Sequence, residues 1–194
     1  MSARLPLFVD LVGRRVLVVG GGRAAERKLS SLLDAGAVVT LIAPKVRASV
    51  RRQLRASPQS QLLRRRAKVQ DVTGRYALLF PLSDDPDLNQ RLSVAAREAK
   101  VWVAGSTSPD GADFHLGAVV DRGPVRLAIS TGGASPALAG LLAEILRQIL
   151  PESLNGDLRL ERQRLRAAVG TPTLQRALLT QAVQVLENRP AESN

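Results

Sequence analysis

A short apolar strand, three consecutive glycines and a helix follow one another near the beginning of the chain. This order constrains the fold more than any other feature. Residues 16–19 are all apolar, which is typical of a buried strand. The glycines at 20–22 end this strand, and residues 24–35 predict a helix that Gly36 terminates. Such a loop leaves unpaired N–H groups at the positive end of the helix dipole, which favours binding of an anion.

The spacing within this loop, Gly20-x-Gly22-x-x-Ala25, fits the fingerprint of dinucleotide-binding proteins. The first glycine allows the tight turn, the second leaves room for a pyrophosphate, and the alanine lets the helix pack closely on the sheet. Many such proteins hold the ribose with a carboxylate after the next strand, but Lys45 and Arg47 stand there instead. These residues taken alone are compatible with NAD or NADP.

The remaining chain alternates strands and helices up to about residue 150. We expect strands at 37–44, within 61–70, at 76–82, 101–106 and 125–130, and helices at 48–56, 85–100 and 135–150. This alternation predicts an α/β fold with a Rossmann-like, doubly wound parallel sheet. After residue 150 the sequence predicts amphipathic helices with no strand between them.

The composition excludes several classes of protein. The chain has no cysteine, which excludes disulfides, thiolate catalysis and cysteine-based metal sites, and His115 is its only histidine. We therefore predict no metal site. No apolar run approaches the length of a membrane span, and the N-terminal run is too short for a signal peptide. We accordingly expect a soluble, cytoplasmic protein with no membrane partner.

The chain carries a formal net charge of +11, and much of the excess is clustered. Residues 45–75 contain ten basic side chains and only one acid, Asp71. Such a cluster attracts anions, although a solvated basic surface would have the same composition. Aromatic residues that could stack on bases are not interleaved with these basic residues, which argues against nucleic acid as the partner.

Three segments together resemble the precorrin-2 dehydrogenase/sirohydrochlorin ferrochelatase family, the N-terminal module of siroheme synthases. These are residues 5–44, "SDDPDLNQRL" at 83–92, and "VVDRGPVRLAISTGGASPALAGLLAEIL" at 119–146. The resemblance covers roughly residues 4–151. It implies a homodimeric enzyme of siroheme biosynthesis that oxidises precorrin-2 to sirohydrochlorin and transfers a hydride to NAD⁺. The basic cluster would then meet a polyanionic tetrapyrrole.

The resemblance also implies site residues and a division of the chain. Cofactor contacts carry over to Gly20, Gly22, Arg23, Ala24, Pro44, Lys45 and Ser83, and substrate contacts to Ser130, Thr131, Gly132, Gly133 and Ser135. We expect an NAD-binding Rossmann-like domain at 1–115. A substrate-binding and dimerisation region at 116–150 and a helical C-terminal tail at 151–194 would follow.

One motif departs from the family pattern. The family's Asn-Val-x-Asp run corresponds to Ala104, Gly105, Ser106 and Thr107, so that Thr107 replaces the acid proposed to act in catalysis. A threonine hydroxyl is a poor general base near neutral pH. We name Thr107 and Asp113 as the catalytic candidates, with His115 as a further proton acceptor. Three alternatives stay open: a slow dehydrogenase, a non-catalytic NAD-binding sensor or scaffold, and a relative that only chelates metal.

Overall fold

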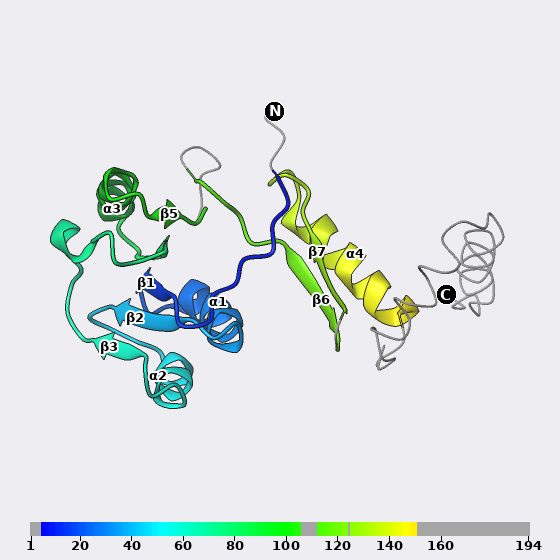
Figure 1. Cartoon of the computed structure of the whole chain (residues 1–194), viewed down its shortest axis with the longest axis horizontal. Coiled ribbons are helices and arrows are strands. Elements are labelled where there is room, and N and C mark those ends of the chain that lie inside the picture. The colour runs from blue at the N-terminus through cyan, green and yellow to red at the C-terminus, as the bar shows by residue number, and fades with distance from the viewer. Residues whose placement is uncertain (1–4, 106–111, 124, 151–194) are drawn as a thin grey trace. The chain divides into compact units, whose positions relative to one another are not determined.

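The computed structural model describes residues 5–105, 112–123 and 125–150 (Figure 1). The chain divides into two compact units, one ending at Leu116 and one beginning at Gly117. Two predictions of the sequence, the catalytic role of Thr107 and the helical tail at 151–194, fall outside the described residues.

The first unit is built on a five-stranded parallel sheet with the order β3-β2-β1-β4-β5. Its strands are β1 (Arg15–Val19), β2 (Val38–Ile42), β3 (Gln61–Leu63), β4 (Leu78–Pro81) and β5 (Trp102–Val103). The chain first adds strands on one side of β1 and then crosses to the other side, so the strand order reverses between β1 and β4. In open sheets of this kind, ligands bind beyond the carboxyl ends of the strands at that point.

Helices cover both faces of the sheet. They are α1 (Arg23–Asp34), α2 (Ala48–Arg55) and α3 (Pro86–Glu98), with a short 3₁₀ helix, η1 (Val69–Asp71). On one face, Leu29 of α1 and Val50 of α2 pack in the same core cluster as Val18. On the other face, Leu92 of α3 packs in a second cluster with Leu17. The predicted doubly wound α/β sheet is thereby confirmed.

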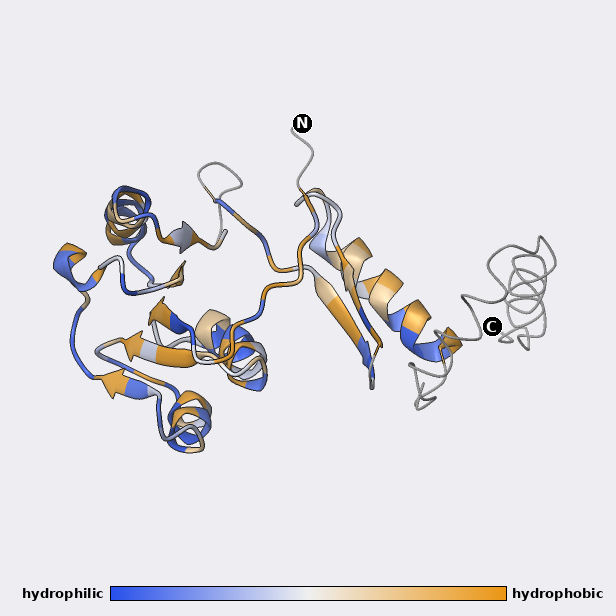
Figure 2. Cartoon of the chain, in the orientation of Figure 1, coloured by the Kyte–Doolittle hydropathy of each residue, from blue (hydrophilic) through white to orange (hydrophobic). Residues whose placement is uncertain are grey.

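The continuous apolar run of β1 follows from this burial on two faces. Val16 and Val18 belong to one core cluster, Leu17 and Val19 to the other, and all four are at most 2% exposed. A strand covered on both sides has no solvated face and therefore no alternating polar positions. Figure 2 shows the same apolar character along the neighbouring strands.

The helix ends agree with the capping residues in the sequence. Asp85 accepts a hydrogen bond from the amide of Leu88 at 3.0 Å, and Pro86 is the first residue of α3. Gly36 lies just after the C-cap of α1 and has a φ of +77°, a conformation that favours glycine. None of the helices in the described ranges is both long and apolar enough to cross a membrane.

The second unit consists of an antiparallel hairpin and one helix. The hairpin pairs β6 (Ala118–Arg122) with β7 (Val125–Ile129), and α4 (Pro136–Ile149) follows. The sequence predicts the second strand but not the first, because residues 118–122 are a short run ending in two charged residues. Tertiary packing forms this strand: Val120 is fully buried, as is Ala143 of α4, and the helix packs on the hairpin (Figure 1).

Candidate cofactor and substrate site

Two glycines of the loop after β1 are required by close backbone packing. Gly20 has a φ of +116°, and a side chain on it would overlap the carbonyl of Leu82 after β4. A Cβ on Gly21 would lie 2.5 Å from the carbonyl oxygen of Lys45, after β2. The amide of Arg47 also donates to the carbonyl of Gly21 at 3.1 Å. These contacts hold the end of β1 directly against the loops that follow β4 and β2.

Gly22 is different, because a Cβ built on it would meet no atom within 4 Å. It is the N-cap residue of α1 and offers no side chain to the first turn. Within the described part of the chain, the amides of Gly22, Arg23 and Ala24 meet no hydrogen-bond acceptor. This combination of open space, unpaired donors and a helix N-terminus suits a pyrophosphate.

The sequence pattern missed the role of Gly21. The dinucleotide fingerprint accepts any residue at this position, yet the contact with the backbone around Lys45 leaves no room for a Cβ. The only sequence signal is that the glycine stands between two others. Ala25, the fourth position of the pattern, is fully buried, which agrees with close packing of α1 on the sheet.

The loop after β2 brings basic residues to this end of the sheet. Pro44 and Lys45 are exposed, and Arg47 forms an ion pair with Glu26 of α1 at 2.8 Å. The pKa of Glu26 is lowered by a hydrogen bond from Ser49 and by the charge of Arg47. Glu26 is therefore engaged within the protein, whereas Lys45 and Arg23, both exposed beside the glycine loop, form no ion pair among the described residues.

The loop after β4 is fixed by the side chain of Asn89, on α3. Its Oδ1 accepts hydrogen bonds from the amide of Ser83 at 3.2 Å and from the Ser83 hydroxyl at 2.6 Å. Its Nδ2 donates to the carbonyl of Ser83 at 2.8 Å. Asn89 was not among the predicted site residues, although it lies in the "SDDPDLNQRL" segment. It positions Ser83, which follows the Leu82 carbonyl that contacts Gly20.

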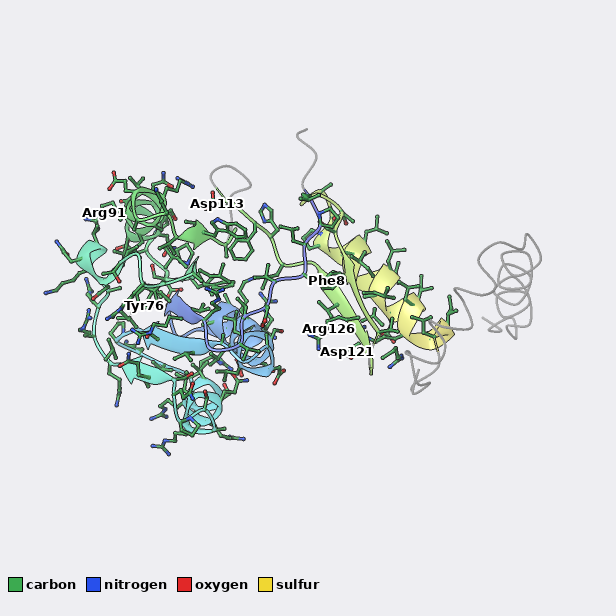
Figure 3. The ribbon with its side chains drawn as sticks, viewed as in Figure 1. Phe8, Tyr76, Arg91, Asp113, Asp121 and Arg126 are labelled. Carbon is green, nitrogen blue, oxygen red and sulfur yellow. The ribbon has the colours of Figure 1, made fainter. Side chains whose placement is uncertain are left out.

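Asp113 makes structural contacts next to β5, the edge strand of the sheet that pairs with β4 (Figure 3). Its Oδ2 accepts a hydrogen bond from the amide of Val103 at 2.7 Å, and its Oδ1 lies 4.0 Å from the Nε of Arg97. The amide of Gly105 donates to the carbonyl of Phe114 at 2.9 Å. Asp113 thus ties the returning segment to β5, whereas the other catalytic candidate, Thr107, lies outside the described residues.

His115 occupies a space that depends on Gly105. A Cβ on Gly105 would overlap the Nδ1 and Cε1 atoms of the His115 ring. Gly105 is the position that corresponds to the valine of the family's Asn-Val-x-Asp run, so the imidazole fills the volume of a missing side chain. The ring is half-buried beside the carboxyl end of β5. No sequence pattern links these two positions.

Lys28 of α1 is a further group that the sequence analysis missed. Its Nζ lies 6.0 Å from the centroid of the Phe80 ring, and Phe114 packs edge-on against that ring at 5.7 Å. Burial lowers the pKa of Lys28 from its ordinary value. An ammonium over an aromatic face is stabilised in its charged form, which opposes the effect of burial.

The predicted substrate residues form the turn between β7 and α4 in the second unit. The Thr131 hydroxyl donates to the carbonyl of Ser135 and accepts from its amide. Ser135 in turn caps α4 by accepting from the amide of Leu138, and the Ser130 hydroxyl accepts from the amide of Gly132. The three hydroxyls therefore hold the shape of the turn.

Gly132 and Gly133, at the tip of this turn, have left-handed φ values of +66° and +91°. A Cβ on either would meet no atom within 4 Å, so the backbone at the tip is accessible. Among the described residues, no group of three carboxylate or imidazole side chains gathers as metal ligands would. The turn and the glycine loop lie in different units.

The fold and the first-unit site define a class. The strand order, the glycine loop at the switch point and the unpaired amides at the start of α1 are those of a Rossmann-like, dinucleotide-binding α/β protein. A family model described as NAD(P)-binding matches residues 7–118, which agrees with this assignment.

Comparisons with known proteins identify the family within this class. The chain is 38% identical over 177 residues to the siroheme synthase of Methylococcus capsulatus, an alignment covering 89% of this chain and 36% of that protein. It is 42% identical over 147 residues to the siroheme synthase of Azotobacter vinelandii, covering 76% and 31% respectively. The solved structure of SirC, a precorrin-2 dehydrogenase, matches with a TM-score of 0.67 and 26% identity, covering 93% of this chain and 100% of that one.

The chain therefore belongs to the precorrin-2 dehydrogenase/sirohydrochlorin ferrochelatase family that its motifs indicated. It spans about a third of the length of the curated siroheme synthases it matches.

Proposed function

We propose that this protein is an NAD-dependent dehydrogenase that oxidises precorrin-2 to sirohydrochlorin in siroheme biosynthesis, acting in the cytoplasm. The observation that carries the proposal is the open position at Gly22 beside unpaired amides at the start of α1, in a chain of this family. A bound dinucleotide supplies the hydride acceptor. The protein itself has to bind the cofactor, align the substrate and accept a proton.

The cofactor contacts that we propose follow from the first unit. The amides of Gly22, Arg23 and Ala24 would bind the pyrophosphate, because they meet no acceptor in the described part of the chain. Pro44 and Lys45 would flank the adenosine end, where the exposed Lys45 adds positive charge.

Ser83 would face the cofactor at the switch point. It is held by Asn89 in the loop that contacts Gly20, and Gly20 makes this close approach possible. We prefer NAD over NADP on the family resemblance, since the residues after β2 are compatible with both.

The substrate contacts that we propose lie in the second unit. Gly132 and Gly133 present accessible backbone at the tip of the turn before α4, and Ser130, Thr131 and Ser135 maintain its shape. The polar backbone of such a turn can accommodate carboxylate groups of a tetrapyrrole. Asp113 would hold the segment between β5 and the second unit rather than take the proton, since its carboxylate is bound to the amide of Val103.

The direct test is to mix the purified protein with precorrin-2 and NAD⁺ and to follow the absorbance of NADH. We expect measurable turnover, because the glycine loop of the proposed cofactor site is present. We expect it to be slow, because Thr107 replaces the acid that the family usually has at this position. Reduction of NAD⁺ but not of NADP⁺ in parallel assays would support the cofactor choice. An inert protein that still binds NAD⁺ would favour the alternative of a non-catalytic NAD-binding sensor or scaffold, for which the observation of Thr107 in place of the acid is the argument.

We also propose that the protein is a homodimer. In the second unit, Leu138, Leu141 and Leu142 of α4 and Val119 of β6 are large apolar side chains exposed to solvent. A two-stranded hairpin and one helix cannot cover these residues alone, and burial against a second copy would remove this apolar surface from water. The helical tail that the sequence predicts at 151–194 would complete this dimer, so a chain ending at Leu150 should become monomeric or aggregate. A truncated protein that remains a dimer by light scattering would show that the tail is dispensable for assembly.

A further inference from the structure

A groove of about 400 Å³ lies between α2 and the edge strand β3 in the first unit. Its walls come from the second half of α2, the turn at 57–60 and the strand itself. It is lined by Arg51, Leu54, Arg55, Ser57, Pro58, Ser60, Leu62 and Arg64. A smaller hollow of about 320 Å³ lies against Ala48, Arg51, Arg52 and Arg55 of the same helix. Cavities of this size are typical of small-molecule sites.

The guanidinium groups around the groove are exposed and uncompensated. Arg51, Arg52, Arg55 and Arg64 form no ion pair with any carboxylate in the described ranges of the chain. Arg47 and Arg65 of the same basic segment differ from them, since they pair with Glu26 and Asp71. The groove therefore concentrates positive charge that no carboxylate in the described part of the first unit neutralises.

Stabilisation of α2 explains the presence of only some of these arginines. Arg52 and Arg55 lie in the last turn of the helix, where cations interact favourably with its dipole. Arg51 and Arg55, however, are four residues apart on one face, and like charges at this spacing destabilise a helix. Arg64 follows β3 and has no helix terminus to stabilise. An anion bound between α2 and β3 would neutralise all of these charges.

The groove is distinct from the cofactor site and from the Asp113 segment. In the sheet, β3 and β5 are the two edge strands, separated by three strands. Four spacings of about 4.8 Å place them roughly 19 Å apart. Most of the lining precedes β3 or lies on α2, and the turn at 57–60 enters β3 at its amino end; only Arg64 follows the carboxyl end, where Gly20 follows β1.

The lining selects one class of ligand. Guanidinium groups bind carboxylates through two parallel hydrogen bonds, which a planar ligand with several peripheral carboxylates can use repeatedly. Pro58 and Leu62 provide an apolar floor between the arginines, above the buried Leu54. A phosphodiester backbone would leave this floor uncovered, and the groove has no aromatic ring on which a base could stack.

We propose that this groove is a second, non-catalytic binding site for a polycarboxylated small molecule with an apolar body. The choice of a tetrapyrrole as that molecule rests on the proposed function, while the groove and its charge do not. Bound there, the ligand places its carboxylates on Arg51, Arg55 and Arg64 and its apolar face on Pro58 and Leu62. The site would hold substrate or product on the enzyme without contacting the cofactor.

The test uses the full-length protein and uroporphyrin, a stable octacarboxylate porphyrin, with binding followed by porphyrin fluorescence. The groove variant is Arg51→Ala/Arg55→Ala/Arg64→Ala, in which only exposed side chains are shortened. A matched control, Arg14→Ala/Arg27→Ala/Arg91→Ala, removes the same charge from exposed arginines elsewhere in the first unit. Coproporphyrin, with half as many carboxylates, and a single-stranded oligonucleotide serve as competing ligands. Thermal unfolding monitors the fold of each variant.

We expect the groove variant to bind uroporphyrin about ten- to a hundredfold more weakly at one class of sites, because each exposed charge pair contributes a factor of a few. The control variant should bind like the wild type, and coproporphyrin should bind more weakly than uroporphyrin. Equal uroporphyrin binding by the two variants would overturn the proposal. So would loss of oligonucleotide binding alone, which would make the groove a nucleic-acid site. NADH formation at saturating precorrin-2 should be unchanged in the groove variant, and it tests the proposed function separately.

Discussion

The imidazole of His115 lies in the space that a side chain on Gly105 would fill. The two residues belong to segments that run side by side, since the amide of Gly105 donates to the carbonyl of Phe114. Because Gly105 does not have a positive φ, its backbone would accept a larger residue; the imidazole is the main obstacle, and the Cβ of Ala112 would lie 3.2 Å from the added atom. The position of the His115 ring therefore requires a glycine at 105.

Replacing Gly105 with valine should destabilise the protein by about 1–3 kcal/mol, the usual cost of overpacking a filled space. The measurement is the free energy of unfolding from denaturant titration. The double variant Gly105→Val/His115→Ala should recover most of this loss, since the smaller residue vacates the space. If the two substitutions are instead additive, the imidazole does not depend on Gly105 for its position.

Replacing Gly22 with valine should abolish NAD binding and leave the stability largely unchanged. The added side chain enters open space at the start of α1, where it blocks the approach of a pyrophosphate without meeting protein atoms. Isothermal titration calorimetry with NAD⁺ and thermal unfolding measure the two effects. Unchanged NAD affinity in this variant would exclude the loop from the cofactor site.

Replacing Gly21 with alanine is the matched comparison for Gly22→Val. Its main effect should be a loss of stability. Its Cβ would lie 2.5 Å from the carbonyl oxygen of Lys45, so the loop after β2 has to move. We expect a loss of stability of about 1–3 kcal/mol by denaturant titration, as for other overpacked positions. A Gly21→Ala protein as stable as the wild type would mean that the loop is adaptable there.

Restoring a carboxylate with Thr107→Asp should raise the rate of NADH formation from precorrin-2. A positioned acid–base group contributes roughly ten- to a thousandfold, which sets the expected gain in kcat. Steady-state kinetics of the variant and the wild type provide the comparison. A fast wild-type enzyme that gains nothing from the substitution would show that another residue takes the proton, and His115→Ala would then be assayed.

Replacing Asp113 with alanine should lower the free energy of unfolding by about 1–2 kcal/mol, since the amide of Val103 loses its acceptor. Asp113→Asn keeps an oxygen at this position and should recover most of that stability. The asparagine variant should also retain its rate of NADH formation. A stable Asp113→Asn protein with a hundredfold lower kcat would instead identify Asp113 as an acid–base residue.

Acidification should weaken the segment after β3 through Asp71. Its carboxylate accepts hydrogen bonds from Arg65 at 2.6 and 2.7 Å and from the amide of Lys68, and the bond with Arg65 is the main cause that lowers the pKa of Asp71. Because the folded pKa is below the unfolded one, the contribution to stability is complete above the unfolded pKa. It is lost as the pH falls through the folded pKa.

Thermal unfolding between about pH 5 and pH 2 should therefore show a loss of stability that is smaller in Asp71→Asn, since asparagine does not titrate in this range. The variant should already be less stable than the wild type at neutral pH. Parallel pH profiles for the two proteins would show that other carboxylates dominate the acid transition.

The sequence by itself determined the α/β class and the anion-binding loop, because both depend on local patterns. The apolar run at 16–19 predicts a buried strand, and the glycines at 20–22 followed by a helix predict the loop. The helices predicted at 85–100 and 135–150 likewise correspond to α3 and α4. These features use hydrogen bonds and side-chain periodicities within a few residues of one another.

Only the tertiary structure decided how distant segments meet. The hairpin strand at Ala118–Arg122 forms because Val120 is buried beneath α4, and its short apolar run ending in two charged residues does not predict a strand locally. Gly21 is required by the backbone at Lys45, Ser83 is fixed by Asn89, and His115 fills the space beside Gly105. Such contacts depend on the distance between chain segments after folding, and local residue preferences do not encode that distance.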